Sequence, residues 1–132
     1  MVKIADYAAL SKHLEELDIS WNSLKPDSFS YFLDRIQDNK KLQFINLGYN
    51  NIVESSLTST SPDASNITEN QLRVAESLLR FMRYGKRLVH LDLTCTNISE
   101  QMFLHMLPGV KKSRSLMSVH FSGNPGVTKH VK

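Results

Sequence analysis

Two histidines and an aspartate are the residues in this sequence best suited to metal chemistry. His90 and Asp92 are two positions apart, so on a β-strand their side chains would share a face, and His120 follows Asp92 by 28 residues. Two imidazoles and a carboxylate are ligands that zinc accepts, but the sequence shows no fourth ligand and no supporting spacing. The favoured interpretation is an ordinary polar surface, and we expect neither a bound metal nor a cofactor.

Sequence motifs for covalent catalysis or phosphate binding are absent. The sequence has no glycine-rich phosphate loop, no nucleophile elbow and no paired metal-ligand motif. Its one cysteine, Cys95, has no activating base nearby in the sequence. We therefore expect a protein that is not an enzyme.

The elements that would position these side chains follow from a repeat. Four segments place apolar residues at offsets 0, 3, 5 and usually 10, and they read LEELDISWNSL, LQFINLGYNNI, LVHLDLTCTNI and LMSVHFSGNPG. They begin at Leu14, Leu42, Leu88 and Leu116, so the steps between them are 28, 46 and 28 residues. The middle step is one period plus an insertion of 18 residues. A period of this length indicates stacked repeats.

The segments between these strands keep the same period. Apolar residues spaced by four and three recur in them, which is the spacing of one helix face. The matching sets are Phe29, Leu33 and Ile36, then Ala75, Leu79 and Met82, then Phe103, Leu107 and Val110, with Met1, Ala5 and Ala8 as a weaker set. The sequence thus predicts strand–helix units with strands near 14–20, 42–48, 88–94 and 116–122.

The pattern LxxLxLxxNxL with a 28-residue period resembles the leucine-rich repeat family, in the ribonuclease-inhibitor-like subtype. The resemblance covers nearly the whole chain. It implies an α/β fold, a right-handed solenoid with short parallel strands on the concave face and helices on the convex face, as a single domain 1–132 of about four repeats. In this family an asparagine at offset 8 satisfies backbone groups of adjacent turns. Here it is Asn22, Asn50 and Asn124. The third repeat has Thr96 at this position, which predicts a weaker ladder of hydrogen bonds between adjacent turns there.

Such a fold directs the residues between the leucines onto the concave face. Phe44 is expected there, with Trp21 and Tyr49 just beyond the strands, and aromatic side chains are typical anchors of protein interfaces. The alternative for Trp21 and Tyr49, favoured for Trp21, is that they fold back onto the neighbouring turn. The polar residues predicted for the same partner-binding surface are Glu16, Asp18, Asn46, His90, Asp92 and His120.

A row of basic residues recurs two positions before each repeat's first leucine. Cations near helix C-termini complement the helix dipole, and this structural role is the favoured explanation. The functional alternative is a basic rim that meets an acidic tail or a phosphorylated segment of a partner. The row consists of Lys12, Lys40, Lys86 and Arg114.

The insertion and the chain ends carry two further expectations. Residues 53–70 are rich in serine and threonine and predict a polar loop on the rim, either a solvated bulge or a binding or phosphorylated loop. Neither end of the sequence resembles a polar cap, so we expect further repeats or a partner to cover the ends.

Composition bounds the class of protein and its compartment. With 41% hydrophobic and 22% charged residues the chain is not wholly disordered, and one cysteine with no signal-like segment favours the cytoplasm. A net charge of +3 is too small to argue for nucleic acid, and no apolar run is long enough for a membrane helix. We expect neither as a partner, although residues 101–132 hold five basic groups and no acid.

Three functions fit these observations. The leading hypothesis is a non-enzymatic scaffold that binds another protein through the concave sheet and adjacent rim. The resemblance also implies two alternatives, a regulator of an enzyme such as an activator of small GTPases, and a structural subunit of a cytoskeletal or ciliary complex.

Overall fold

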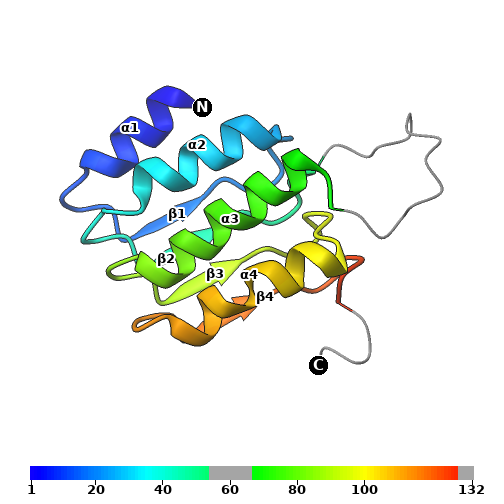
Figure 1. Cartoon of the computed structure of the whole chain (residues 1–132). Helices are drawn as coiled ribbons and strands as arrows, with labels where there is room; N and C mark the ends of the chain where they lie inside the picture. Colours follow the sequence, from blue (N-terminus) through cyan, green and yellow to red (C-terminus); the bar gives the residue numbers. More distant parts are fainter. Residues whose placement is uncertain (54–66, 128–132) are drawn as a thin grey trace.

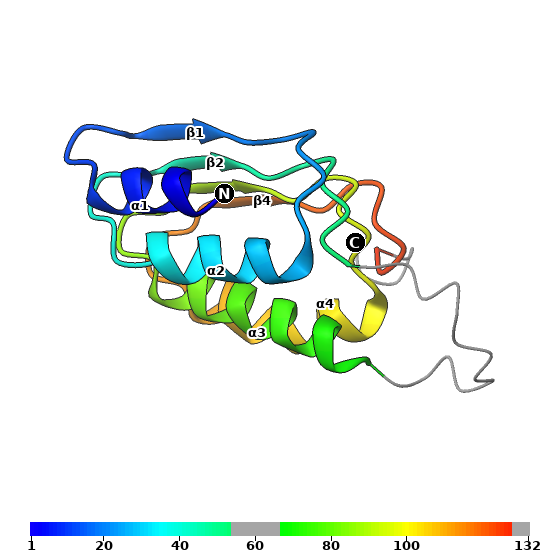
Figure 2. The ribbon, with the colours of Figure 1, turned by 90° about the horizontal axis from the view of Figure 1, so that it is seen from above.

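Helices and strands alternate along residues 1–53 and 67–127, the part of the chain described by the computed structural model. The helices are α1 (Val2–Leu10), α2 (Pro26–Ile36), α3 (Glu69–Tyr84) and α4 (Glu100–Lys112). The strands are β1 (Glu16–Asp18), β2 (Phe44–Asn46), β3 (His90–Asp92) and β4 (Ser118–His120). They pair in parallel in the order β1-β2-β3-β4. Figures 1 and 2 show the helices together on one face of this sheet.

This arrangement confirms the α/β solenoid predicted from the repeat, while its handedness stays a prediction. The strand register reproduces the spacing of the repeats, because Leu17, Ile45, Leu91 and Val119 lie side by side across the sheet. Ile45 and Leu91 are fully buried, and Leu17 and Val119 at the outer strands are half-buried. Strand side chains alternate between faces, so the aliphatic row faces the helices and leaves the opposite face open. We call that opposite face the open face.

The helices cover the sheet with the apolar stripes that their spacing predicted. Ala5, Phe29, Leu33, Met82 and Phe103 are buried among them. The last two helices begin with side-chain caps, in which Thr68 forms a capping box with Gln71 and Ser99 accepts a hydrogen bond from the backbone N–H of Met102. The predicted insertion 53–70 lies mostly outside the described residues, since 54–66 are not among them.

Buried asparagines join neighbouring repeats. Asn50 accepts from the backbone N–H groups of the first repeat and donates to carbonyls of both repeats, and Asn124 does the same between the third and fourth repeats. Thr96 donates its hydroxyl to the carbonyl of Leu93 in its own repeat and makes no such bridge to the second repeat within the described residues. The second and third repeats therefore lack this bridge, in agreement with the shorter side chain.

The contact between α3 and α4 depends on a glycine. A Cβ atom on Gly109 would lie 2.7 Å from the carbonyl oxygen of Leu79, which belongs to the backbone of α3 and cannot rotate away. Replacing glycine by alanine within a helix ordinarily stabilises it by about 1 kcal/mol. We expect Gly109→Ala to do the opposite and lower the free energy of unfolding by about 1–3 kcal/mol, because the two helices must separate. Urea denaturation measures this, with Gln101→Ala, at an exposed position of α4, as the control that changes little.

Candidate functional site

A hollow of about 360 Å³ lies on the open face of the sheet. Strands β1, β2 and β3 line it, and the side chains between the aliphatic positions form its walls. Six of the nine residues predicted for partner contact line this hollow, namely Glu16, Asp18, Phe44, Asn46, His90 and Asp92. The structure therefore brings together residues that are up to 76 positions apart in the sequence, from Glu16 to Asp92.

An aromatic row runs from the hollow, where Phe44 and His90 lie, to His120 on β4. Phe44 keeps 43% of its surface exposed, and its ring centroid lies 6.3 Å from that of His90. The His90 and His120 ring centroids are 4.8 Å apart. Phe44 and His90 are register partners on β2 and β3, whereas His90 and His120 are diagonal neighbours, since His120 pairs with Asp92. Its rings are tilted to one another by 36° and 43°, so the row offers a partner an uneven surface that is partly apolar and carries imidazole groups at one end.

The acidic and amide side chains of the hollow also accept hydrogen bonds from the backbone just after each strand. Asp18, Asn46 and Asp92 occupy one register position, and in each the Oδ1 atom accepts the backbone N–H of the residue two positions later, at 2.9, 3.0 and 2.8 Å. The Ser20 hydroxyl also donates to Asp18, 2.7 Å away. These bonds from Ser20, with a smaller contribution from the Asn46 amide, lower the pKa of Asp18. Asp18 is therefore ionised at neutral pH, and the first repeat contributes negative charge to the hollow.

Trp21 and Tyr49 form an exposed stack where β1 and β2 end. Their ring centroids are 4.0 Å apart with an angle of 7° between the planes, while 72% of Trp21 and 44% of Tyr49 stays exposed. The Trp21 ring thus stacks on the side chain of the neighbouring turn and still presents an aromatic surface to solvent. Both residues have a left-handed backbone, with φ of 60° and 56°. This conformation is costly for a side chain with a Cβ atom.

The geometry does not support a zinc site at His90, Asp92 and His120. Asp92 does lie beside His120, as the register predicted, but its Oδ1 is occupied by the Thr94 backbone N–H. The Nε2 atom of His120 lies 3.3 Å from the Ser118 hydroxyl. Among the residues that the structure describes, no group of three or more His, Cys, Asp or Glu side chains is placed to hold a metal ion.

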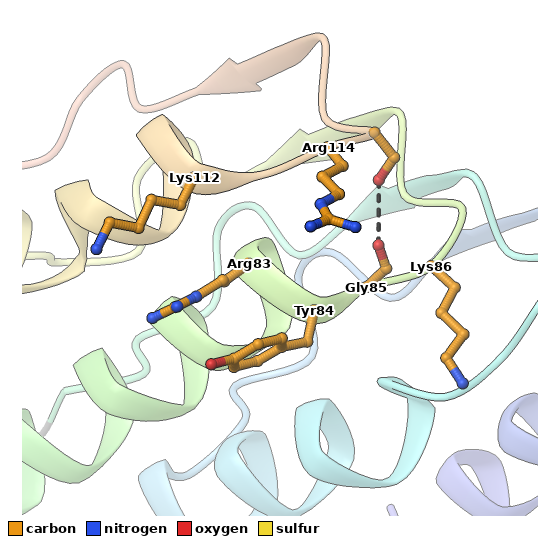
Figure 3. A pocket seen from close by; sticks show the side chains of 7 residues that line it. Arg83, Tyr84, Gly85, Lys86, Lys112 and Arg114 are labelled. Atoms are coloured by element: carbon orange, nitrogen blue, oxygen red, sulfur yellow. Dashed lines mark hydrogen bonds between the residues drawn. The ribbon is translucent and has the colours of Figure 1, made fainter.

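The predicted basic rim divides into two parts. Lys86 and Arg114 line a second cleft between the C-terminal ends of α3 and α4, whereas Lys12 and Lys40 do not (Figure 3). Lys86 also forms an ion pair with Asp38 at 3.4 Å. Sequence reasoning missed Arg83 and Tyr84, which line the same cleft. They lie in the last turn of α3, and the 28-residue register does not mark them, because the equivalent positions of the second repeat are Gln37 and Asp38.

The comparisons with known proteins agree with this architecture. A leucine-rich repeat family model matches residues 10–28. A solved tropomodulin C-terminal domain from Caenorhabditis elegans is similar in structure, with a TM-score of 0.68, 11% sequence identity and coverage of 93% of this chain. This chain spans 64% of the length of that domain. No curated protein matches the sequence.

The likeness to a solved domain at low identity shows the fold, and the matched segment covers the first repeated strand. Together they support a leucine-rich repeat protein. None of the helices in the described part of the chain is long and apolar enough to cross a membrane.

Proposed function

We propose that this chain is a non-enzymatic scaffold that binds another protein through the open face of its sheet and the adjoining Trp21–Tyr49 stack. We also assign it to the ribonuclease-inhibitor-like subtype, on the grounds of the 28-residue period and the helix in each unit. The open face corresponds to the concave face that the repeat predicted. A solenoid suits this role because its rigid backbone presents a broad surface without being ordered on binding.

The observation that carries the proposal is the exposure of three aromatic side chains, one on β2 and two on the turns that follow β1 and β2. Phe44 lies in the hollow, and Trp21 and Tyr49 lie at the carboxyl ends of the strands beside it. Leaving large apolar side chains in water forgoes about 1.5–3 kcal/mol each relative to burial. A partner that covers these side chains recovers this free energy, and such aromatic anchors dominate the energetics of known interfaces.

The charges around Phe44 define the partner's chemistry. Glu16, Asp18 and Asp92 surround the hollow with carboxylates, and Asp18 is held ionised by its hydrogen bonds. The complementary partner segment presents an apolar side chain to Phe44 and places lysine or arginine beside it. Charge complementarity of this kind mainly raises the association rate and specificity.

Replacing Phe44 with alanine tests the proposal. Because this side chain is exposed and its strand is fixed by Ile45, we expect partner binding to weaken by about 1–3 kcal/mol with little change in stability. The partner is first captured from an extract of the native source with immobilised wild-type chain, and its affinity for both proteins is then measured by calorimetry. Urea denaturation checks the stability of the variant.

The matched control is Tyr7→Ala, which removes another exposed aromatic side chain on α1, in the helix layer. This variant should bind as the wild type does. Equal loss of affinity in both variants would show that binding depends on exposed apolar surface in general and not on Phe44. Unfolding of Phe44→Ala would show that Phe44 belongs to the core and would remove the proposal.

A second candidate function is a structural subunit of a cytoskeletal or ciliary complex. The observation that favours it is the likeness to a tropomodulin domain. Fractionation of the native cell separates the two candidates, because a structural subunit would remain in the detergent-resistant pellet. Recovery of the chain in the supernatant, bound to a separate partner, favours the scaffold.

A further inference from the structure

A second surface of the molecule, distinct from the open face, gathers positive charge. A cleft of about 680 Å³ opens where α3 and α4 end and the chain turns toward β3 and β4. It lies at the amino ends of the strands, whereas the Trp21–Tyr49 stack lies at their carboxyl ends, so the two surfaces are at opposite ends of the strands. Figure 3 shows the residues that line it, which are Arg83, Tyr84, Gly85, Lys86, Lys112, Arg114 and Ser115.

The cations of this cleft have few anionic neighbours. Lys86 pairs with Asp38 at 3.4 Å, and in Figure 3 it points away from the other cations. Arg83, Lys112 and Arg114 make no ion pair with any carboxylate in the described parts of the chain. Their side chains are exposed, and no acidic residue lines the cleft. The cleft therefore carries a local excess of positive charge.

The negative C-terminal ends of the α3 and α4 dipoles do not account for all of this positive charge. The carbonyl of Gly85, at the end of α3, is occupied by the Ser115 hydroxyl at 3.1 Å, as the dashed line in Figure 3 shows. The guanidinium of Arg83 lies over the Tyr84 ring, 5.0 Å from its centroid, and not at a helix carbonyl. The dipole of a single helix end corresponds to about half an elementary charge, so two arginines and a lysine exceed what α3 and α4 need.

We propose that this basic cleft binds a phosphate monoester carried by a segment of a partner protein. Guanidinium groups donate paired hydrogen bonds to phosphate oxygens, and a phosphoserine or phosphothreonine carries close to two negative charges at neutral pH. Arg83 and Arg114 supply such donors from two different repeats, Lys112 adds a point charge, and the Tyr84 hydroxyl is a further donor. The proposal does not depend on the open face.

The shape of the site favours a peptide over a lipid surface. Arg83, Lys112 and Arg114 line one recess of about 680 Å³ formed by two repeats, so a phosphorylated side chain placed in it meets donors from both. A bilayer instead meets a broad basic surface, on which charges act additively. The other members of the basic rim, Lys12 and Lys40, lie outside the recess, and this difference gives the test its control.

Fluorescence anisotropy with the full chain tests the assignment. The probes are a labelled alanine-rich peptide with a central phosphoserine, the same peptide with serine, and the same peptide with glutamate. We expect the phosphorylated probe to bind, and the Arg83→Gln, Arg114→Gln double variant to weaken its binding by roughly tenfold or more. The Lys12→Gln, Lys40→Gln double variant removes the same charge from the same rim and should bind as the wild type does.

The pH dependence adds a second readout. The second ionisation of the phosphate has a pKa of about 6, so binding should weaken as the pH falls through this value. Equal affinity for the glutamate and phosphoserine probes would show that the cleft binds any negative charge, and this would overturn the proposal. Equal loss of affinity in both double variants would overturn it for the same reason. So would an absence of binding to the phosphorylated probe. Arg114-dependent binding only to phosphatidylcholine vesicles that contain phosphatidylinositol bisphosphate would assign the cleft to a membrane instead.

Discussion

Replacing Asn50 with alanine should lower the free energy of unfolding by about 3–5 kcal/mol, a large share of the 5–15 kcal/mol typical of a domain. The side chain is fully buried. Its oxygen accepts the backbone N–H groups of Asn22 and Leu24 at 2.9 and 3.2 Å, and its nitrogen donates to the carbonyls of Ile19 and Leu47 at 3.0 and 2.9 Å. Alanine leaves all four backbone groups without these partners.

Urea denaturation followed by circular dichroism measures this loss. The matched control is Asn51→Ala, which removes the same side chain from the next position, where it is exposed and its amide oxygen lies 3.4 Å from Asn97. That control should stay within about 0.5 kcal/mol of the wild type. A comparable loss in the two variants would show that the asparagine ladder does not join the first two repeats.

The period of the sequence predicted the architecture because burial acts on every repeat in the same way. Aliphatic side chains at offsets 3 and 5 must face the helix layer, and this requirement alone aligns Leu17 with Ile45 and Leu91. The position of Asp92 beside His120 followed from the same register. The residues brought to the open face could thus be predicted without knowledge of any contact.

Contacts that depend on the path of a turn could not be predicted in this way. The period places Trp21 and Tyr49 at equivalent positions, but the choice between stacking and separation depends on their left-handed backbone. Periodicity does not report backbone angles. The second role of Asp18 and Asp92, as acceptors for the backbone N–H groups that follow the strands, was hidden for the same reason.

The basic cleft was predicted only in part. The row that contains Lys86 and Arg114 was visible in the sequence, but a row along one edge does not show where the surface is hollowed. The recess forms where α3 and α4 end, and the last turns of both helices supply Arg83 and Lys112. Their convergence results from helix packing, which the spacing of charges in the sequence does not predict.

Replacing both Trp21 and Tyr49 with glycine should weaken partner binding by about 2–4 kcal/mol. The stack offers two aromatic faces that a partner can cover, and rigid aromatic side chains lose little entropy on binding. Glycine is the appropriate replacement because Gly123 occupies the equivalent position of the fourth repeat with φ of 72°. The backbone N–H groups of residues 21 and 49 keep their bonds to the carbonyls of Gly48 and Thr94.

Stability and binding should separate in this variant. A left-handed residue with a Cβ atom costs about 1–2 kcal/mol, which glycine relieves, whereas glycine adds chain entropy to the unfolded state and the lost stack removes about 0.5–1.5 kcal/mol. These terms nearly cancel, so the urea midpoint should change little while calorimetry with the captured partner shows the loss. Unchanged affinity would mean that the stack only braces the two turns. The same position is left-handed at Cys95 as well, so the conformation belongs to the turn, and the exposed aromatic rings themselves are what this variant tests.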